Sequence, residues 1–324
     1  MKLTDLKRND MELIRVCKMY YLENRTQQEI AKVIGVSRSM VSRLLTEARK
    51  RGLVEIRIHE DKISGTDLEQ ILISRFDLVD ATIVDTSPQR YLDSIAEAGA
   101  SYLEKTIEDG MVVGISWGRT LAKVIDYIVT SKKLRHTIFV PLLGGVGQLR
   151  YEYQVNTLVE KIADAFDSAR YYLHAPAFFD DHMSLKHMLN NESVRSIVEL
   201  WDKLDLAVVG IGEPISLSNA FRSVLPQSFV SILVGQGAVG DIAARFFNRN
   251  GVSCDPADYH NHILGVKLEQ LRKTSQVIGI AGGPEKVRAI CAAMRGKLIK
   301  TLITDVHTAR EIISVSDNEN RTCM

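Results

Sequence analysis

One short segment of the sequence combines residue types that favour the binding of an anion. The apolar run at residues 277–280 is followed by Gly282, Gly283 and Pro284, and Lys286 comes three residues after the second glycine. Glycines at the end of a strand let backbone N–H groups approach a ligand, and the first turn of a helix attracts negative charge. Proline suits that turn because the N–H group it lacks would have no partner there. The segment therefore predicts a phosphate site that includes Lys286; an ordinary strand–turn–helix connection is the alternative.

The same arrangement recurs in three other places. Apolar runs end near Gly114, near Gly144 and Gly145, and near Gly210 and Gly212. In an open α/β sheet, ligands bind beyond the carboxyl ends of the strands, so four such ends favour an anionic ligand. The chain contains neither a Walker loop nor a dinucleotide fingerprint after its first strand, which argues against those two nucleotide-binding classes.

Ser116 raises a second possibility. The pattern Gly114-Ile115-Ser116-Trp117-Gly118 matches the Gly-x-Ser-x-Gly motif of serine hydrolases. A hydrolase needs an acid and a histidine later in the chain. Of the histidines that follow, His260, His262 and His307 have no recognisable motif around them. We therefore interpret Ser116 as a hydroxyl donor to a phosphate, with a nucleophile as the alternative.

The elements that would position these residues alternate along the chain. Strand-like segments are expected at residues 81–86, 111–115, 137–143, 169–176, 204–210, 277–280 and 301–305, and helical ones at 66–76, 94–107, 121–129, 156–166, 238–247, 285–294 and 307–313. Alternating strands and helices predict an α/β fold, with a doubly wound parallel sheet covered by helices on both faces. The polar tail at residues 314–324 is expected to be frayed.

The N-terminal segment has a different pattern. Residues 8–22 have helical periodicity, and Thr26 with Glu29 has the spacing of a capping box that starts a second helix. Gly35 suits the end of that helix, and Ser37 can cap a third helix that stops at Gly52. The alternation at residues 53–58 predicts a strand that would form a wing.

This pattern predicts a helix-turn-helix. Ala31 is small where two helices would touch, Gly35 lies in the turn, and Val41 faces a shared core. The DNA-binding residues predicted on the outer face are Thr26, Gln27, Ser37, Arg38, Ser39, Ser42 and Arg43. A core helical hairpin with incidental arginines is the alternative, and the arginines could contact phosphates alone.

Composition limits the classes of protein. The 324 residues are 45% apolar and 25% charged, with a net charge of +1. Residues 1–57 contain 13 basic and 7 acidic residues, whereas the remainder contains 28 and 33, so a basic first segment precedes an acidic body. No apolar run is long enough to span a membrane and no signal peptide is evident, so we expect a cytoplasmic protein. The scattered cysteines, Cys17, Cys254, Cys291 and Cys323, predict reduced thiols, and no metal or cofactor site is expected.

Together these motifs resemble the SorC-type, or DeoR-like, family of bacterial sugar-responsive transcription regulators. The resemblance covers nearly the whole chain and rests on the helix-turn-helix and on the segments GISWGRT, VPLLGGVG, VVGIGEP, GAVGDIAARFF and IAGGPEKVRAI. It implies a winged helix-turn-helix domain at residues 1–58. It also implies an effector-binding and oligomerisation domain at residues 59–324, related to sugar-phosphate isomerases and coenzyme A transferases. Members are commonly tetramers whose operator binding is switched by a phosphorylated sugar.

The resemblance also implies site residues. The turn formed by Gly144, Gly145, Val146 and Gly147 resembles a phosphate-binding turn of the family. Asp241 corresponds to an acid that contacts sugar hydroxyls, and Lys286 to a lysine that binds the phosphate. Arg222 matches a phosphate-binding arginine in a loop of variable length.

One departure from the family concerns covalent binding. Leu143 stands where some deoxyribose-phosphate sensors have a lysine that forms a Schiff base, so covalent capture is not expected. Loop residues that could select the sugar, or simply be solvated, are Asp181, His182, Arg222 and Gln227.

The sequence thus predicts a repressor of a carbohydrate-utilisation operon rather than an enzyme. It would be a dimer or tetramer that binds a palindromic operator and responds to a phosphorylated sugar. Two other hypotheses remain open. One is a sugar-phosphate isomerase with an appended helix-turn-helix, which would need a carboxylate base such as Asp241 or Glu213. The other is an architectural DNA-binding protein that has no effector.

Overall fold

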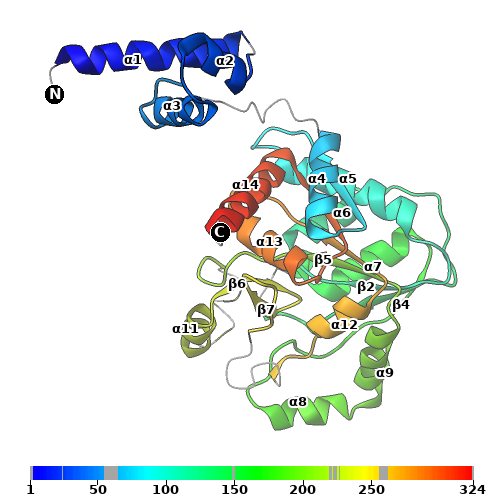
Figure 1. The fold of residues 1–324 in the computed structure, drawn as a ribbon. Helices are drawn as coiled ribbons and strands as arrows, with labels where there is room; N and C mark the ends of the chain where they lie inside the picture. The colour runs from blue at the N-terminus through cyan, green and yellow to red at the C-terminus, as the bar shows by residue number, and fades with distance from the viewer. Residues whose placement is uncertain are drawn as a thin grey trace. The chain divides into compact units, whose positions relative to one another are not determined.

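The chain divides into two compact units, Met1–Lys62 and Ile63–Met324, which are described separately. The computed structural model describes residues 3–23, 25–54, 65–147, 150–218, 221, 225, 227–254 and 262–322, with side chains left out at 3–9, 227–228 and 319–322. Within these residues, no helix combines the length and the apolar character that crossing a membrane requires. Figure 1 traces the elements of both units along the chain.

The first unit is helical. Its elements are α1 (Leu3–Cys17), the π-helical turn η1 (Lys18–Leu22), α2 (Gln27–Ile34) and α3 (Arg38–Lys50). The apolar positions of the three α-helices share one small core, formed by Leu13, Val16, Ile30, Ala31, Val41, Leu45 and Ala48 among others. The predicted wing lies mostly outside the described residues; Leu53 and Val54, where it would begin, pack against this core.

The second unit contains the predicted parallel sheet. Seven parallel strands run in the order β1-β9-β8-β5-β2-β3-β4. Their bounds are β1 Asp80–Val84, β2 Val112–Ile115, β3 Ile138–Pro141, β4 Ala169–Arg170, β5 Leu206–Gly210, β8 Gln276–Ile280 and β9 Thr301–Asp305. Both faces of the sheet are covered, which explains why its central strands are continuous apolar runs.

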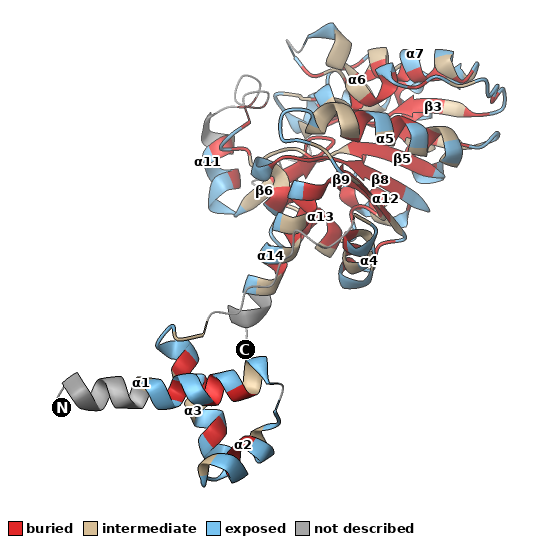
Figure 2. Cartoon of the chain, turned by 90° about the horizontal axis from the view of Figure 1, so that it is seen from above, coloured by how far each residue is buried: buried red, intermediate tan, exposed pale blue. Residues whose placement is uncertain are grey.

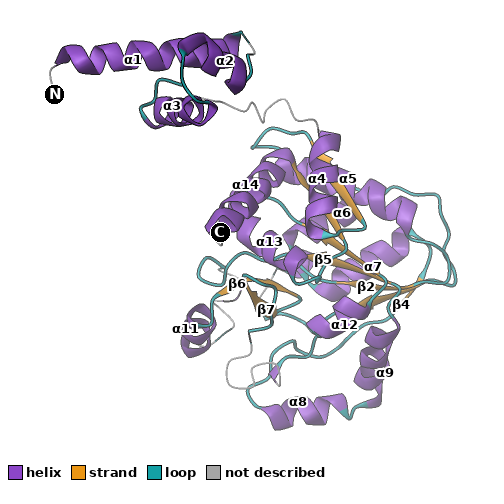
Figure 3. Cartoon of the chain, in the orientation of Figure 1, coloured by secondary structure: helices purple, strands orange, loops and turns teal. Residues whose placement is uncertain are grey.

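Helices cover the sheet on both sides (Figure 3). One layer contains α5 (Tyr91–Thr106), α6 (Arg119–Asp126) and α7 (Val155–Ala165), and the other contains α4 (Gly65–Phe76), α13 (Val287–Arg295) and α14 (Val306–Thr322). The other helices among the described residues are α8 (His182–Leu189), α9 (Glu192–Leu200), α11 (Gln227–Gly235) and α12 (Leu268–Lys273), with 3₁₀ turns η3 (Tyr151–Tyr153), η4 (Trp201–Lys203) and η6 (Pro284–Lys286). Figure 2 shows the strands β5, β8 and β9 as a buried layer between the helices.

The order of the strands creates a switch point between β2 and β5. From β2 the chain continues outward to β3 and β4, whereas from β5 it continues in the opposite direction to β8 and β9. The connections that follow β2 and β5 therefore run over opposite faces of the sheet. In doubly wound sheets, ligands bind where the winding reverses, beyond the carboxyl ends of the strands.

The prediction of a helix at residues 238–247 is wrong. This segment is an antiparallel hairpin of β6 (Ala238–Ile242) and β7 (Arg245–Asn248), separate from the main sheet. Ala243 and Ala244 form its two-residue turn with φ of 50° and 62°, values that L-residues rarely adopt. Because both turn residues are alanines, the segment resembles a helix in composition, and tertiary contacts determine its conformation.

Other segments also differ from those predicted. The tail is not frayed after residue 313, because α14 continues to Thr322, and Asp317 in it forms an ion pair with Arg75 of α4 at 2.7 Å. The strand expected at 169–176 ends at Arg170, and the chain then leaves the sheet as a loop. Gly114 lies inside β2, where a Cβ would clash with Leu142, rather than beyond the end of the strand.

Candidate functional site

The turn between α2 and α3 has the predicted capping interactions. The N–H group of Thr26 donates to Oε2 of Glu29 at 2.8 Å, and Oγ1 of Thr26 accepts the N–H group of Glu29 at 3.3 Å. The N–H and hydroxyl groups of Thr26 both donate to the Glu29 carboxylate and lower its pKa. Gly35 ends α2 with a φ of 73°, and Oγ of Ser37 accepts the N–H group of Met40 at the start of α3. Each capping bond gives a partner to a helix N–H group that would otherwise lack one. This stabilises a helix that is too short to be stable alone.

The outer face of this unit is polar and basic. On α3, Val41, Leu45 and Ala48 are buried in the small core. The predicted DNA-binding residues of the same helix are all exposed: Arg38, Ser39, Ser42 and Arg43. A recognition helix exposes its N-terminal residues to the major groove in this way.

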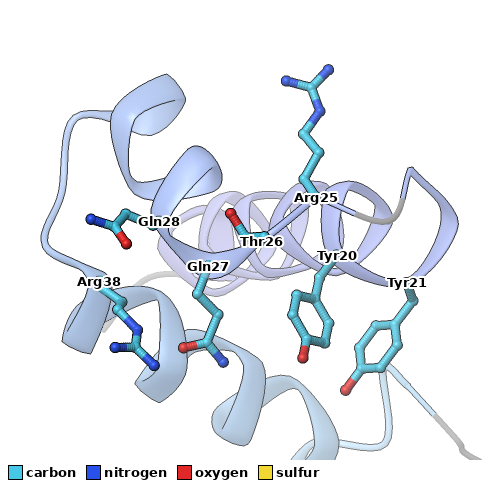
Figure 4. Close-up of a pocket in the computed structure, with 7 residues that line it drawn as sticks. All are labelled: Tyr20, Tyr21, Arg25, Thr26, Gln27, Gln28 and Arg38. Atoms are coloured by element: carbon cyan, nitrogen blue, oxygen red, sulfur yellow. The ribbon is translucent and has the colours of Figure 1, made fainter.

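A hollow of about 740 Å³ adjoins this face (Figure 4). Its lining includes Thr26, Gln27 and Arg38, which were predicted, and four residues that were not: Tyr20, Tyr21, Arg25 and Gln28. In Figure 4 the two tyrosines, Gln27 and Arg38 extend to the same side, whereas Arg25 extends away from them.

The two tyrosines were missed because of the π-helical turn. Read with α-helical spacing, Tyr20 falls on an apolar face; within the π-helical turn Lys18–Leu22, both tyrosines pack against the small core and also line the hollow. Their rings meet edge to face at 4.9 Å between centroids, and both side chains remain partly exposed. Two adjacent tyrosines just before a capped helix were the available sequence signal.

In the second unit, the double-glycine turn after β3 uses its N–H groups internally. Those of Gly144 and Gly145 donate to the carbonyl oxygens of Leu264 and Ala175, at 2.9 and 2.8 Å. That of Val146 donates to Oε1 of Gln154 at 3.1 Å. The expected role of these three N–H groups as anion donors therefore does not match the described structure. Close packing explains Gly144 instead, because a Cβ there would lie 2.5 Å from the backbone of Pro176.

Asp241 is a buried carboxylate with a structural partner. Its side chain, 4% exposed, accepts the N–H group of Ala244 on Oδ2 at 3.1 Å, across the strained turn of the hairpin. Burial raises the pKa of Asp241 to about 7; Glu213 adds to this effect, and the Ala244 N–H group and Lys286 oppose it. The N–H group of Gly212, two residues beyond the end of β5, donates to the carbonyl oxygen of Asp241, which places Asp241 at the carboxyl end of that strand.

Lys286 lies where the sequence predicted it. Gly283, with a φ of 107°, precedes the 3₁₀ turn η6, Pro284 occupies its first position, and Lys286 is the N-cap residue of α13. Its side chain is half-buried, and loss of solvent lowers its pKa, as does Arg119, whereas Glu213, Glu285 and Asp241 oppose this change. The N–H group of Gly283 itself donates to Oγ1 of Thr308 at 2.8 Å, so at this turn the side chain of Lys286, rather than that N–H group, would attract an anion.

Ser116 lies just beyond β2, at the switch point. Its side chain is 1% exposed, and its N–H group donates to the carbonyl oxygen of Val208 in β5. Two of the histidines considered for a triad bond elsewhere: His262 to the carbonyl oxygen of Phe179, and His307 to that of Thr86. Neither pairs with Ser116 as a triad would require, and His260 lies outside the described residues.

The residues expected to select the sugar are only partly described. Arg222 and the side chain of Gln227 lie outside the described residues. Asp181 caps α8, accepting the N–H and hydroxyl groups of Ser184, and these bonds lower its pKa. His182, the first residue of α8, is exposed.

The arrangement suits an anionic ligand that also carries hydroxyl groups. A half-buried ammonium group attracts an anion because little water screens it, and a carboxylate accepts hydrogen bonds from hydroxyls. The electrostatic influences on Lys286 place two further acids, Glu213 and Glu285, and one further cation, Arg119, around it. No group of three or more metal-ligating side chains occurs in the part of the chain that the structure describes.

Comparison with known proteins shows similarity along most of the chain. Residues 61–314 match the family model described as "Putative sugar-binding domain", and residues 10–51 match region 4 of sigma-70 factors. The sorbitol operon regulator of Klebsiella pneumoniae is 30% identical over 306 residues, covering 93% of this chain and 97% of the relative. The deoxyribonucleoside regulator of Bacillus subtilis is 30% identical over 304 residues, covering 93% and 96%.

Solved structures agree with these matches. The full-length sorbitol operon regulator SorC of Klebsiella pneumoniae superposes with a TM-score of 0.75 at 29% identity, covering 94% of this chain and 99% of that one. The structure described as "Probable sor Operon Regulator" from Shigella flexneri superposes with a TM-score of 0.72 at 30% identity, covering 77% of this chain and 99% of that one. The chain belongs to the SorC-type family of sugar-binding transcriptional regulators.

Proposed function

We propose that the chain represses a carbohydrate-utilisation operon and is released from its operator by a phosphorylated sugar. Residues 1–58 would bind a palindromic operator, and residues 59–324 would bind the effector and form a dimer or tetramer. The family and the names of the relatives support a sugar-responsive regulator. The observation that carries the phosphorylated effector is the half-buried Lys286 close to the buried Asp241, beyond the carboxyl ends of the strands.

The switch needs a difference in affinity between two states of the protein. An effector changes operator binding only if it binds one conformation better than the other. The same coupling free energy then acts in both directions, so bound operator must weaken effector binding by the same factor. Substitution of a residue that holds the effector, such as Lys286, should change the response to the sugar but leave operator affinity unchanged in its absence.

A thermal-shift screen tests the class of effector. The panel contains the phosphates of sorbitol, deoxyribose, erythritol, glucose and ribose, the same compounds without phosphate, and inorganic phosphate. A ligand present at about 100 times its Kd stabilises the folded state by about 2.7 kcal/mol, which raises Tm measurably. We expect a sugar phosphate to raise Tm and its unphosphorylated form to have no effect. Stabilisation by unphosphorylated sugars alone would contradict a phosphorylated effector, and so would no stabilisation at all.

The enzymatic alternative has one observation in its favour. A carboxyl group with a pKa of about 7, as in Asp241, could act as a general base. However, Oδ2 of this carboxylate accepts the N–H group of Ala244, and Oδ1 packs against Gly212. The relatives are named regulators rather than enzymes. Isomerisation of a panel sugar phosphate by the purified protein, lost in Asp241→Asn, would establish the alternative.

A further inference from the structure

An aromatic cluster lies beside the proposed effector site. The ring of Phe221 meets that of Trp117 edge to face at 5.6 Å between centroids, and that of Phe246 at 5.0 Å. Phe178 completes the cluster at 6.3 Å from Phe221. Phe246 in β7 is the cross-strand partner of Asp241 in β6, so the cluster is continuous with the hairpin that holds the buried carboxylate.

Trp117 occupies the switch point of the sheet. It directly follows Ser116, whose N–H group donates to Val208 of β5. Its own carbonyl oxygen lies 3.7 Å from the Cβ position of Gly210, the last residue of β5. Trp117 therefore lies between the carboxyl ends of β2 and β5, where doubly wound sheets bind their ligands.

Trp117 differs from its aromatic neighbours in its exposure. Phe221 and Phe246 are buried, at 2% and 0% exposed, whereas Trp117 is only partly buried. The other groups identified around Lys286 are charged, so they suit a phosphate and hydroxyl groups. A sugar also presents apolar C–H surfaces, and small-molecule sites combine a few polar groups with aromatic walls.

We propose that Trp117 forms the aromatic wall of the effector site and contacts the carbon skeleton of the sugar, while Lys286 binds the phosphate. This assignment rests on the proposed function, because it presumes a sugar phosphate as the effector. It divides recognition between two residues: Lys286 would attract any phosphate, and Trp117 would distinguish a sugar phosphate from inorganic phosphate.

The chain contains two tryptophans, which makes the assignment directly measurable. Trp201 is 3% exposed, and its Nε1–H group donates to the carbonyl oxygen of Pro141 at 2.9 Å. In Trp201→Phe, all tryptophan emission comes from Trp117. We expect that emission to change saturably with the panel member that raises Tm most, and to remain unchanged with inorganic phosphate.

A binding measurement provides the second test. Calorimetry on Trp117→Leu should show affinity for the same sugar phosphate lowered by about five- to tenfold, with competition by inorganic phosphate unchanged. Trp201→Phe should bind as the wild type does. If Trp117→Leu does not fold, the emission of Trp117 in the Trp201→Phe variant decides alone. Unchanged emission on saturation, or unchanged affinity in folded Trp117→Leu, overturns the role of Trp117 but leaves the proposed function intact. Absence of any sugar-phosphate binding to the wild type overturns both.

Discussion

The carboxylate of Asp241 lies against the backbone of Gly212 so closely that no side chain fits between them. A Cβ built on Gly212 would lie 1.7 Å from Oδ1 of Asp241. The N–H group of Gly212 also donates to the carbonyl oxygen of Asp241 at 2.9 Å. The loop that follows β5 and the β6–β7 hairpin therefore fix each other's position at the carboxyl ends of the strands.

Gly212→Ala should disrupt this contact. The added methyl group forces the buried carboxylate to move, and overpacking of this kind costs about 1–3 kcal/mol of stability. We also expect weaker sugar-phosphate binding by calorimetry. Gly235→Ala is the control, because no atom lies within 4 Å of its Cβ position. Equal sugar-phosphate affinity in wild type and Gly212→Ala would show that the contact does not shape the site.

Asp241 should make stability depend on pH in an unusual direction. Burial raises its pKa from 3.8 to about 7, so between these values the folded chain holds a proton that the unfolded chain has lost. The contribution of this carboxyl to stability therefore falls as pH rises through that window. Relative to the wild type, Asp241→Asn should gain up to about 1.4 kcal/mol of unfolding free energy per pH unit.

Urea unfolding at several pH values between 4 and 7 measures this difference. Asp181→Asn is a control of opposite sign, because hydrogen bonds from Ser184 lower the pKa of Asp181. Because the folded pKa of Asp181 lies below its ordinary value of 3.8, its contribution changes only below that value. With the series extended to that more acidic range, the variant should lose stability relative to the wild type as the pH rises. A parallel pH dependence in Asp241→Asn and wild type would mean that Asp241 is ionised throughout.

Arg43 should contribute to operator binding. It is exposed on α3, on the outer face that carries Arg38 and Ser39. If its guanidinium binds a guanine bidentately, Arg43→Ala should weaken binding by about 1–3 kcal/mol and relax specificity at one base pair. The site is selected from random DNA, and affinity is measured by fluorescence anisotropy. Arg49→Ala, in the last turn of the same helix, should have a smaller effect; equal effects would indicate general electrostatics.

The assembly should contain an even number of protomers. One helix-turn-helix contacts a short stretch of DNA, and two-fold pairing on a palindrome adds a second half-site. We expect sedimentation velocity to show a dimer or tetramer both free and on DNA. A monomer under both conditions would refute this expectation.

The sequence predicted the elements whose signals are local. The capping box of Thr26 and Glu29, the turn at Gly35 and the strand–turn–helix around Lys286 each depend on a few neighbouring residues. The parallel sheet was predicted from the alternation of apolar runs and helical patterns, because the spacing of apolar residues in a segment indicates which of its faces are buried.

Features that depend on distant contacts were not predicted. The turn of the β6–β7 hairpin holds two alanines in left-handed conformations, and the carboxylate of Asp241 that accepts the N–H group of Ala244 also packs against Gly212 in another loop. Likewise, nothing near Gly144 and Gly145 in sequence indicates that their N–H groups bond to Leu264 and Ala175. Local propensity is a weak guide where tertiary contacts provide the partners.

The central claim is that a phosphate held by Lys286 controls operator binding. Its most direct test is the concentration of the stabilising sugar phosphate that releases half of the operator, measured by anisotropy for wild type, Lys286→Ala and Lys273→Ala. Lys273 is an exposed lysine before β8, at the opposite edge of the sheet. Loss of a charged hydrogen bond weakens binding of the sugar phosphate by roughly 1.5–3 kcal/mol, so Lys286→Ala should need a concentration about ten- to hundredfold higher. Operator affinity in the absence of sugar should be unchanged. Lys273→Ala should behave as the wild type. An unchanged dose–response in Lys286→Ala would contradict the account.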